Sequence, residues 1–427
     1  MVRTQNGSLE INLEIPQMEK DEDVEYLEKA SFNNNDHSQI KPDDIVVIYD
    51  MDYFQHLMET RRSYELSEDI CIYLMVKFLI YLFKDKTQDF NKMECIKDLR
   101  SKMDMAVNYI YHQHIITNET SRQYYEDMSY MAHKIYQQYM EILEENHLEL
   151  NSQQLELLKN KLNSIRLNLG NLPQRIIYPQ CFNKQQPSLN TNEIENIFAN
   201  IPKLHPTNYY KNHLELLKHR FWKSLLYEQD YSFYISIDNN MGASCTPMYY
   251  GPQNMVILFQ GYLQGHIYNP KMDQLSKWSL LGFTLAHEFT HAIDTSNMLF
   301  GPDGYELDSD LGIKNHTNFQ KSLECLQQQL PTDSIEERMA DLMGAQVAFR
   351  AYTKEETDSQ DSDKPWKKLF FLNLSKFFCG VKGFQFSGHD SNAQRLHQIV
   401  ANDPVFAEAF NCPAGSKMNP VKKCRVF

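Results

Sequence analysis

His287-Glu288-Phe289-Thr290-His291 is the most informative stretch of this 427-residue chain. Residues i and i+4 share one face of a helix, so His287 and His291 can bind a single Zn²⁺ ion, with Glu288 beside the open coordination position. Bound zinc lowers the pKa of its water to about 7, and the Glu288 carboxylate can accept a proton from that water. The pentapeptide therefore predicts a zinc hydrolase site, against the alternative of a chance match.

The residues around the pentapeptide have the pattern of an amphipathic helix. The stretch from Trp278 to Ser296 is predicted to be helical, with Ser276 or Ser279 as its N-cap. The apolar side of this helix, turned away from the two histidines, would carry Leu281, Leu285 and Phe289. Such a helix presents both imidazoles on one face, as a zinc site requires.

A second helical segment, Ser334 to Tyr352, offers the remaining metal ligand. Glu337 would complete a site of two histidines and one glutamate, and Asp341, one turn later, could hold the outer nitrogen of a ligating histidine. Asp294 on the first helix is a similar outer candidate. The alternative is that Ser334-x-x-Glu337 is only a capping box at a helix start, with Arg338 and Asp341 on a solvated face.

These paired motifs and several flanking blocks resemble the neprilysin family of zinc endopeptidases, which are gluzincins. The family's His-Glu-x-x-His and Glu-x-x-x-Asp motifs are both present, at 287–291 and 337–341. Further similar blocks are Tyr249-Tyr250 through Leu263-Gln264, Phe370-Phe371-Leu372-Asn373, and the segment from Phe410 to Phe427. Weaker similarity lies at Ile45 to Tyr49 and at Cys95, so most of the chain is expected to correspond to the C-terminal part of a longer family member.

The resemblance implies a role for each candidate residue. It assigns the zinc ligands to His287, His291 and Glu337, the general base to Glu288, and the orienting carboxylates to Asp294 and Asp341. Asp341 also matches a proton donor of the family. His389 and Arg395 keep the family's spacing of a histidine and an arginine near the substrate, where they would donate to the oxyanion and order the pocket. From the sequence alone, a histidine in such a polar loop is more often a surface residue.

The fold class expected is mainly α with a small β-sheet (α+β). The resemblance implies a zincin-like catalytic domain at 173–427, a partial helical cap domain at 44–172 and a polar N-terminal segment at 1–43. The periodicity predicts helices over Ser121 to Glu145, Gln153 to Leu169 and Asn212 to Tyr227, and strands over Tyr231 to Ile237 and Met255 to Phe259. The apolar run Ile70 to Phe83 is interrupted by Lys77, which predicts a buried helix and no membrane span.

Composition limits the partners and the cellular address. A net charge of −14 argues against nucleic acid or an anionic membrane as a partner. No apolar signal stretch precedes Asp43, so no signal peptide or anchor is visible, although the resemblance implies an extracellular or cell-surface protein. Glycosylation sequons at Asn118, Asn315 and Asn373 are compatible with secretion. The sequence leaves the oligomeric state open.

The eight cysteines are expected to fall into three groups. By resemblance, Cys325 and Cys424 would form a disulfide within this chain. Cysteines whose family partners lie outside this chain are matched by Cys95, Cys379 and Cys412. The remaining three, Cys71, Cys181 and Cys245, have no counterpart that resemblance assigns, and their pairing cannot be read from spacing.

One departure from the family bears on function. The family's Asn-Ala before Tyr-Tyr is Pro247-Met248 here, which removes a side-chain amide that would bond the substrate main chain and a backbone N–H. The expected function is a zinc-dependent endopeptidase that hydrolyses short peptides on the amino side of apolar residues, with zinc-bound water activated by Glu288. The alternatives are a catalytically weak or inactive zinc protein that binds peptides or other partners, and a shortened chain that folds poorly.

Overall fold

The computed structural model divides the chain into two compact units. The first comprises Met1–Asp98 with Trp222–Leu226, and the second Leu99–Phe221 with Tyr227–Phe427. The residues that the structure describes are 2–5, 8–11, 46–48, 52, 55–56, 68–85, 91–172, 176–181, 201–226, 246–263, 267–307, 309–355, 365–379 and 388–427. The domain boundaries expected after residues 43 and 172 stay a prediction.

The first unit contains a small antiparallel sheet and an apolar helix. Its sheet has the order β1 (Val2–Gln5), β2 (Ser8–Ile11), β3 (Val46–Ile48). Helix α3 (Glu68–Asp85) holds the apolar run, but most of its large apolar side chains are exposed, up to 63% for Met75. The expected buried helix is therefore wrong in its burial, because an apolar run determines a helix but not what covers it. Among the described residues, no helix has the length and apolarity needed to cross a membrane.

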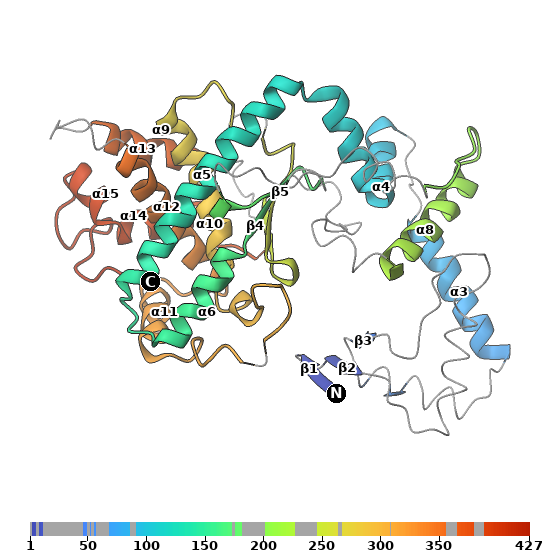
Figure 1. Ribbon diagram of the computed structural model, residues 1–427, viewed down its shortest axis with the longest axis horizontal. Coiled ribbons are helices and arrows are strands. Elements are labelled where there is room, and N and C mark those ends of the chain that lie inside the picture. Colours follow the sequence, from blue (N-terminus) through green and yellow to red (C-terminus); the bar gives the residue numbers. More distant parts are fainter. Residues whose placement is uncertain are drawn as a thin grey trace. The chain divides into compact units, whose positions relative to one another are not determined.

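The second unit is mainly α-helical with a small mixed sheet, as the sequence predicts (Figure 1). Helices α4 (Lys92–Ile115) and α8 (Tyr209–Leu226) contribute residues to both units. The other helices of this unit are α5 (Asn118–Glu145), α6 (Ser152–Asn163), α9 (Gln274–Lys277), α10 (Phe283–His291), α11 (Thr317–Gln329), α12 (Ile335–Glu355), α13 (Pro365–Phe377), α14 (Asn392–Asn402) and α15 (Pro404–Ala409).

The sheet of the second unit has the strand order β5-β4-β7-β6. Strand β4 (Arg166–Leu169) runs parallel to β7 (Met255–Leu258), which is apolar and buried along its whole length, as a central strand should be. Strand β5 (Ile176–Ile177) lies beyond β4. Strand β6 (Met248–Tyr250) pairs antiparallel with β7 at the other edge and is only partly buried. Among the described residues, the sheet thus ends at the strand that contains the Tyr-Tyr pair.

Two sequence predictions are changed by this sheet. The helix expected over 153–169 ends at Asn163, and its last part becomes β4, because pairing with β7, far away in sequence, overrides the local apolar pattern. The strand expected over 255–259 is present as β7. The strand expected over 231–237 lies outside the described residues.

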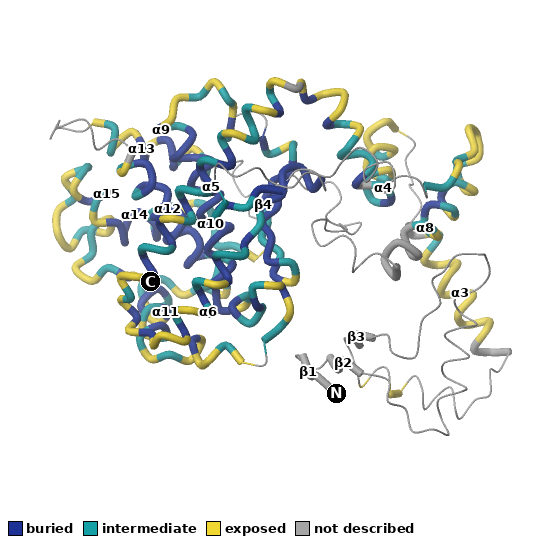
Figure 2. Tube along the Cα trace, viewed as in Figure 1, coloured by how far each residue is buried: buried dark blue, intermediate teal, exposed yellow. Residues whose placement is uncertain are grey.

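Helices α5, α10 and α12 form the centre of the core (Figure 2). Tyr139 of α5 is fully buried, donates to the Ala286 carbonyl at 2.8 Å and lies 2.5 Å from the Thr290 hydroxyl, both on α10. Its ring stacks on Phe289 with centroids 6.5 Å apart. One side chain of α5 therefore fixes the turn of α10 between the two histidines.

The disulfide Cys325–Cys424 is present and links α11 to the C-terminal segment. The other cysteines within the described residues, which are Cys71, Cys95, Cys181, Cys379 and Cys412, are free thiols. Cys245 lies outside the described residues.

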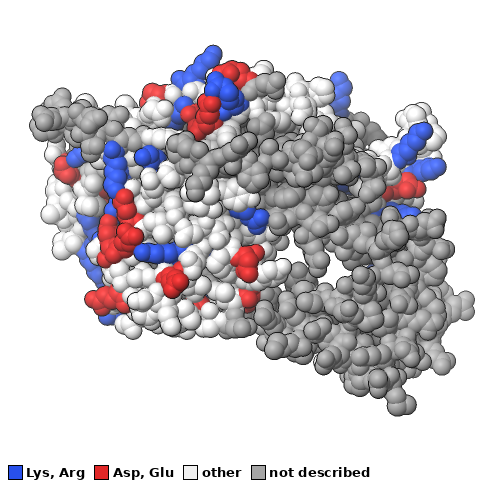
Figure 3. All heavy atoms as spheres, viewed as in Figure 1, with Lys and Arg blue, Asp and Glu red and all other residues white. Residues whose placement is uncertain are grey.

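The structure also shows how surface charges are distributed and how exposed two of the predicted glycosylation sites are. On the face shown in Figure 3, the basic and acidic side chains of the described residues are interspersed. Asn373 is only 3% exposed and its amide donates to Ser276 at 3.2 Å, so this sequon is not open to glycosylation in the folded chain. Asn315 lies exposed before α11.

Candidate metal centre

The two histidines are held on a helix that begins earlier than the sequence suggests. Helix α9 is capped by Asp273, whose carboxylate accepts from the Ser276 backbone N–H at 2.9 Å, and it continues through a π-helical segment, Trp278–Gly282, into α10. The predicted caps are therefore wrong: Ser276 is the donor to the cap, and the Ser279 hydroxyl donates to the Leu275 carbonyl inside the helix.

The same helix ends earlier than expected because of Asp294. The Oδ1 atom of Asp294 accepts from the backbone N–H groups of Ser296 at 2.9 Å and Asn297 at 2.7 Å. This local turn competes with further helix, so α10 ends at His291 and not at Ser296. His287 and His291 lie one turn apart on α10, with their Nε2 atoms 3.2 Å from each other.

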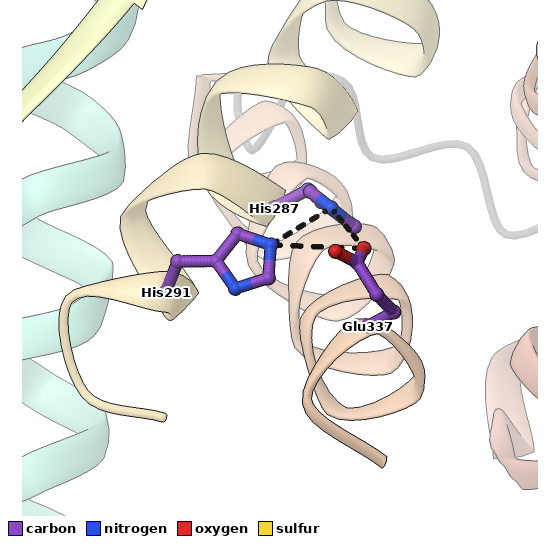
Figure 4. A group of neighbouring side chains, drawn as sticks. All are labelled: His287, His291 and Glu337. Atoms are coloured by element: carbon purple, nitrogen blue, oxygen red, sulfur yellow. Dashed lines mark hydrogen bonds and ion pairs between the residues drawn. The ribbon is translucent and has the colours of Figure 1, made fainter. Parts of the chain in front are cut away.

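Glu337 in the first turn of α12 reaches the same point from the opposite side (Figure 4). Its Oε2 lies 3.2 Å from His287 Nε2 and 3.7 Å from His291 Nε2. The three ligand atoms all lie within 4.8 Å of one another. Helix α12 can approach this closely because residue 344 is glycine, where a Cβ would lie 2.9 Å from the His287 backbone nitrogen. Two imidazoles and one carboxylate thus converge from two helices.

The donor set fits a zinc ion. Glu337 Oε2 is buried and has no hydrogen bond of acceptable geometry, although three imidazole nitrogens lie within ion-pair distance of it. A short distance without alignment contributes little as a hydrogen bond. A buried carboxylate oxygen without an aligned donor, facing two imidazole nitrogens, has the composition of a two-histidine, one-glutamate zinc site.

The Nδ1 atoms of both histidines, which point away from the metal position, lie next to the carboxylates of Asp294 and Asp341, as the sequence predicts. His291 Nδ1 lies 2.8 Å from Asp294 Oδ2, and His287 Nδ1 lies 3.1 Å from Asp341 Oδ1. Arg395 donates to both oxygens of Asp341, from Nε and Nη2, each at 2.7 Å. These carboxylates fix the ring orientation, so that each Nε2 faces the metal position.

Electrostatics follow from burial and from these contacts. Burial opposes the charged form of Asp341, but the Arg395 guanidinium outweighs it and holds the pKa of that carboxyl below its usual range. Burial likewise opposes charge on Glu337, but its contacts with His287, His291 and His389 lower its pKa strongly. Both groups are therefore carboxylates at neutral pH.

The pKa of the Glu288 carboxyl is shifted in the opposite direction from those of Glu337 and Asp341. It is 7% exposed, and burial raises the pKa of its carboxyl above the ordinary value of 4.5. Its carboxylate also accepts a hydrogen bond from the Tyr249 backbone N–H, which links it to edge strand β6. A carboxylate with a raised pKa next to a metal position is suited to accept and return a proton.

His389 reaches the centre from the loop before α14. Its Nε2 lies 2.9 Å from Glu337 Oε2. Arg395 is 5% exposed and contacts Asp341, with its guanidinium 5.3 Å from the centre of the Phe378 ring. The structure thus brings every candidate site residue of the sequence into one cluster, and their roles stay predictions.

Sequence reasoning missed a buried lysine beneath the site. Lys161 of α6 is 1% exposed, and its ammonium donates to the Asn297 carbonyl in the turn formed by Asp294. Burial lowers its pKa to about 7. One signal was present in the sequence, because Lys161 shares the apolar face of α6 with Leu158 and Leu162.

The alternative that Arg338 lies on a solvated face of its helix is wrong, because its side chain is buried and the residue is only 3% exposed.

Comparison with known proteins agrees with this geometry. Residues 247–426 match the family described as Peptidase family M13. Membrane metallo-endopeptidase-like 1 of Mus musculus is 24% identical over 438 residues, which cover 91% of this chain and 54% of that protein. Human neprilysin is 26% identical over 287 residues, covering 60% of this chain and 37% of that protein. The chain spans about half the length of the curated relatives it matches.

Solved structures show the same fold. The zinc metalloprotease Zmp1 of Mycobacterium tuberculosis, in complex with an inhibitor, has a TM-score of 0.58 at 16% identity, covering 80% of this chain and 52% of that chain. A Haemonchus galactose-containing glycoprotein complex has a TM-score of 0.63 at 18% identity, covering 88% and 61%. Together, these matches identify the chain as a relative of the neprilysin family of zinc metallopeptidases, peptidase family M13.

Proposed function

We propose that this chain forms the catalytic part of a zinc-dependent endopeptidase that hydrolyses short peptides on the amino side of apolar residues. The observation that supports it most is the convergence of His287, His291 and Glu337 within 4.8 Å, with Glu288 one residue from the first ligand. A metallopeptidase needs a metal position, a general base and a strand beside which an extended peptide can bind, all close together. The candidates for these three features lie on α10, α12 and β6.

The substrate would add to edge strand β6. An edge strand leaves backbone groups open on one side, and an extended peptide can pair with them antiparallel. The strand is only three residues long and follows Pro247, which has no N–H to offer. Because the Tyr249 N–H bonds to Glu288, substrate binding along this strand would depend on the remaining backbone groups of these three residues.

The reaction depends on a few side chains around the metal position. Zinc, when bound there, would polarise the scissile carbonyl and make the attacking water more acidic. Glu288 then accepts a proton from that water and delivers it to the leaving amine nitrogen. His389 donates a hydrogen bond to the oxygen that develops negative charge, while Asp341, held ionised by Arg395, keeps His287 in place.

The proposed preference for an apolar residue is supported by aromatic side chains beside His287. Phe283 lies with its ring centre 6.0 Å from that of His287, and it packs edge-on against Phe377 at 5.0 Å. Phe378 lies 5.7 Å from Phe283. Of these rings, Phe283 is 1% and Phe378 is 7% exposed, so they make the surroundings of His287 apolar, which supports a preference for an apolar side chain after the scissile bond.

The address proposed is extracellular or at the cell surface. The Cys325–Cys424 disulfide is typical of proteins that fold in an oxidising compartment, and the mouse relative is named a membrane metallo-endopeptidase-like protein.

The test is hydrolysis of a fluorogenic peptide with an apolar residue after the scissile bond. Zinc-loaded protein should cleave it, Glu288→Gln should lower kcat by at least about 100-fold, and the exposed control Glu324→Gln on α11 should leave kcat unchanged. Negligible cleavage by folded, zinc-loaded wild-type protein would reject the peptidase.

A second candidate function is favoured by Pro247-Met248 at the substrate strand. The chain would then be a catalytically weak or inactive zinc protein that binds peptides without turnover. Calorimetry with the same peptide separates the two, because a binding protein would hold it in a zinc-dependent manner while leaving it intact.

A further inference from the structure

A partly buried ion pair joins helix α12 to the loop that contains His389. Arg338 follows the ligand Glu337 directly on α12 and is 3% exposed. Its Nε and Nη2 donate to Asp390 Oδ2 at 3.1 and 2.5 Å. The other Asp390 oxygen accepts from the Thr332 hydroxyl at 2.9 Å. Both carboxylate oxygens of Asp390 are therefore engaged by residues that flank the start of α12.

The ion pair lies next to the contact between His389 and Glu337. On the helix, Glu337 and Arg338 are neighbours in sequence, and on the loop, so are His389 and Asp390. His389 Nε2 lies 2.9 Å from Glu337 Oε2, so each residue of one pair contacts a residue of the other. Because adjacent Cα atoms are about 3.8 Å apart, anchoring the Asp390 side chain also limits where the His389 backbone can lie.

We propose that the Arg338–Asp390 ion pair is a positioning pair that holds His389 over the metal centre. This inference rests on the proposed function, in which His389 donates to the developing oxyanion. A donor contributes to catalysis only if its position is fixed before the reaction, since otherwise its ordering adds to the barrier. The Arg338–Asp390 ion pair fixes the loop through a group that itself stays out of contact with the substrate.

Asp390 is the residue that can test this. Arg338 also donates from Nη1 to the carbonyls of Leu326 and Leu330 at the end of α11, so its replacement would disturb helix packing as well. Asp390→Asn keeps the size and the acceptor for Thr332 but removes the charge that pairs with Arg338. The matched control is Glu145→Gln, which removes the carboxylate paired with Arg350 near the other end of the same helix.

The experiment measures kcat, KM and zinc affinity for zinc-loaded wild type, Asp390→Asn, His389→Ala and the double variant. We expect Asp390→Asn to lower kcat by about 10-fold or more, with KM and zinc affinity within about threefold of wild type. In the His389→Ala background the same substitution should have no further effect on kcat. Equal losses in both backgrounds, or a loss of zinc affinity that accounts for the lower rate, would overturn the inference.

A readout without turnover separates this inference from the proposed function. Hydrogen exchange at the amides of 388–391 should be faster in Asp390→Asn than in wild type and in Glu145→Gln. A phosphinic peptide, which mimics the tetrahedral oxyanion, should bind about 10-fold more weakly to Asp390→Asn, while a thiol peptide should bind equally well to both. Unchanged exchange would reject the positioning role, even in a chain that proved inactive as a peptidase.

Discussion

His287 lies directly against Gly344, so that a Cβ at position 344 would come 2.9 Å from the His287 backbone nitrogen and 3.1 Å from its Cβ. This contact sets the distance between α10, which carries two of the candidate metal ligands, and α12, which carries the third.

Gly344→Ala should destabilise the protein although alanine is the better helix former. Helix propensity alone would stabilise by up to about 1 kcal/mol, whereas the overpacked contact costs about 1–3 kcal/mol. Because the clash acts between the ligand helices, zinc affinity should fall as well. Urea unfolding and chelator competition measure the two effects, and a variant with unchanged stability and zinc affinity would show that the helices can separate freely.

Asp341→Asn should weaken zinc binding by about 10- to 100-fold, because an amide orients the His287 ring less well than a carboxylate held by Arg395. Chelator competition is the measurement. The exposed Asp333→Asn serves as the matched control and should bind zinc like wild type. Equal affinities for both variants would mean that the ring is fixed by packing alone.

Lys161 should make stability depend on pH in the metal-free protein. Burial lowers its pKa to about 7, whereas it titrates near 10.5 in the unfolded chain. Between these values the unfolded state binds more protons, so the contribution of Lys161 to stability should rise with pH from about 7 to 10. Relative to Lys161→Met, wild type should gain roughly 2–3 kcal/mol between pH 7 and 9.5 in urea unfolding. Parallel stability curves for the two proteins would contradict this.

Removal of the Cys325–Cys424 disulfide by serine at both positions should lower the unfolding free energy by about 4 kcal/mol, because the bond closes a loop across a sequence separation of 99. Urea unfolding under non-reducing conditions measures it. Replacement of the free, exposed Cys95 by serine is the control and should have little effect. A double variant with the same unfolding free energy as wild type would show that the disulfide does not stabilise the fold.

The sequence points to the three side chains that converge in the structure because much of their geometry is local. His287 and His291 share a face through helical period alone, and Glu337 and Asp341 repeat this spacing on a second helix. The remaining step, that the two helices meet, came from family resemblance and not from the spacing. Gly344, which allows the close approach, gives no such signal by itself, since an isolated glycine in a helix has several explanations.

The parts that sequence reasoning missed depend on contacts between distant segments. The Glu288 carboxylate meets the Tyr249 backbone, which has no side-chain signature, and Asp390 meets Arg338 across 52 positions. The local pattern predicts helix where strand β4 forms, because the partner strand β7 lies far along the chain. Helix α3 shows the opposite limit, since its apolar run predicts the helix correctly but not its exposure.

The bond from Tyr139 to α10 has a practical consequence for dissecting the molecule. A fragment that began at residue 173 would keep every metal ligand but would lose Tyr139, together with the strand that pairs with β7 in the interior of the sheet. Helix α10 would then lack the hydroxyl that bonds its Ala286 carbonyl, and β7 would become an edge strand paired only with β6. The smallest piece able to bind zinc in a native manner is therefore expected to begin before α5, and limited proteolysis should leave α5 attached to the metal-binding core.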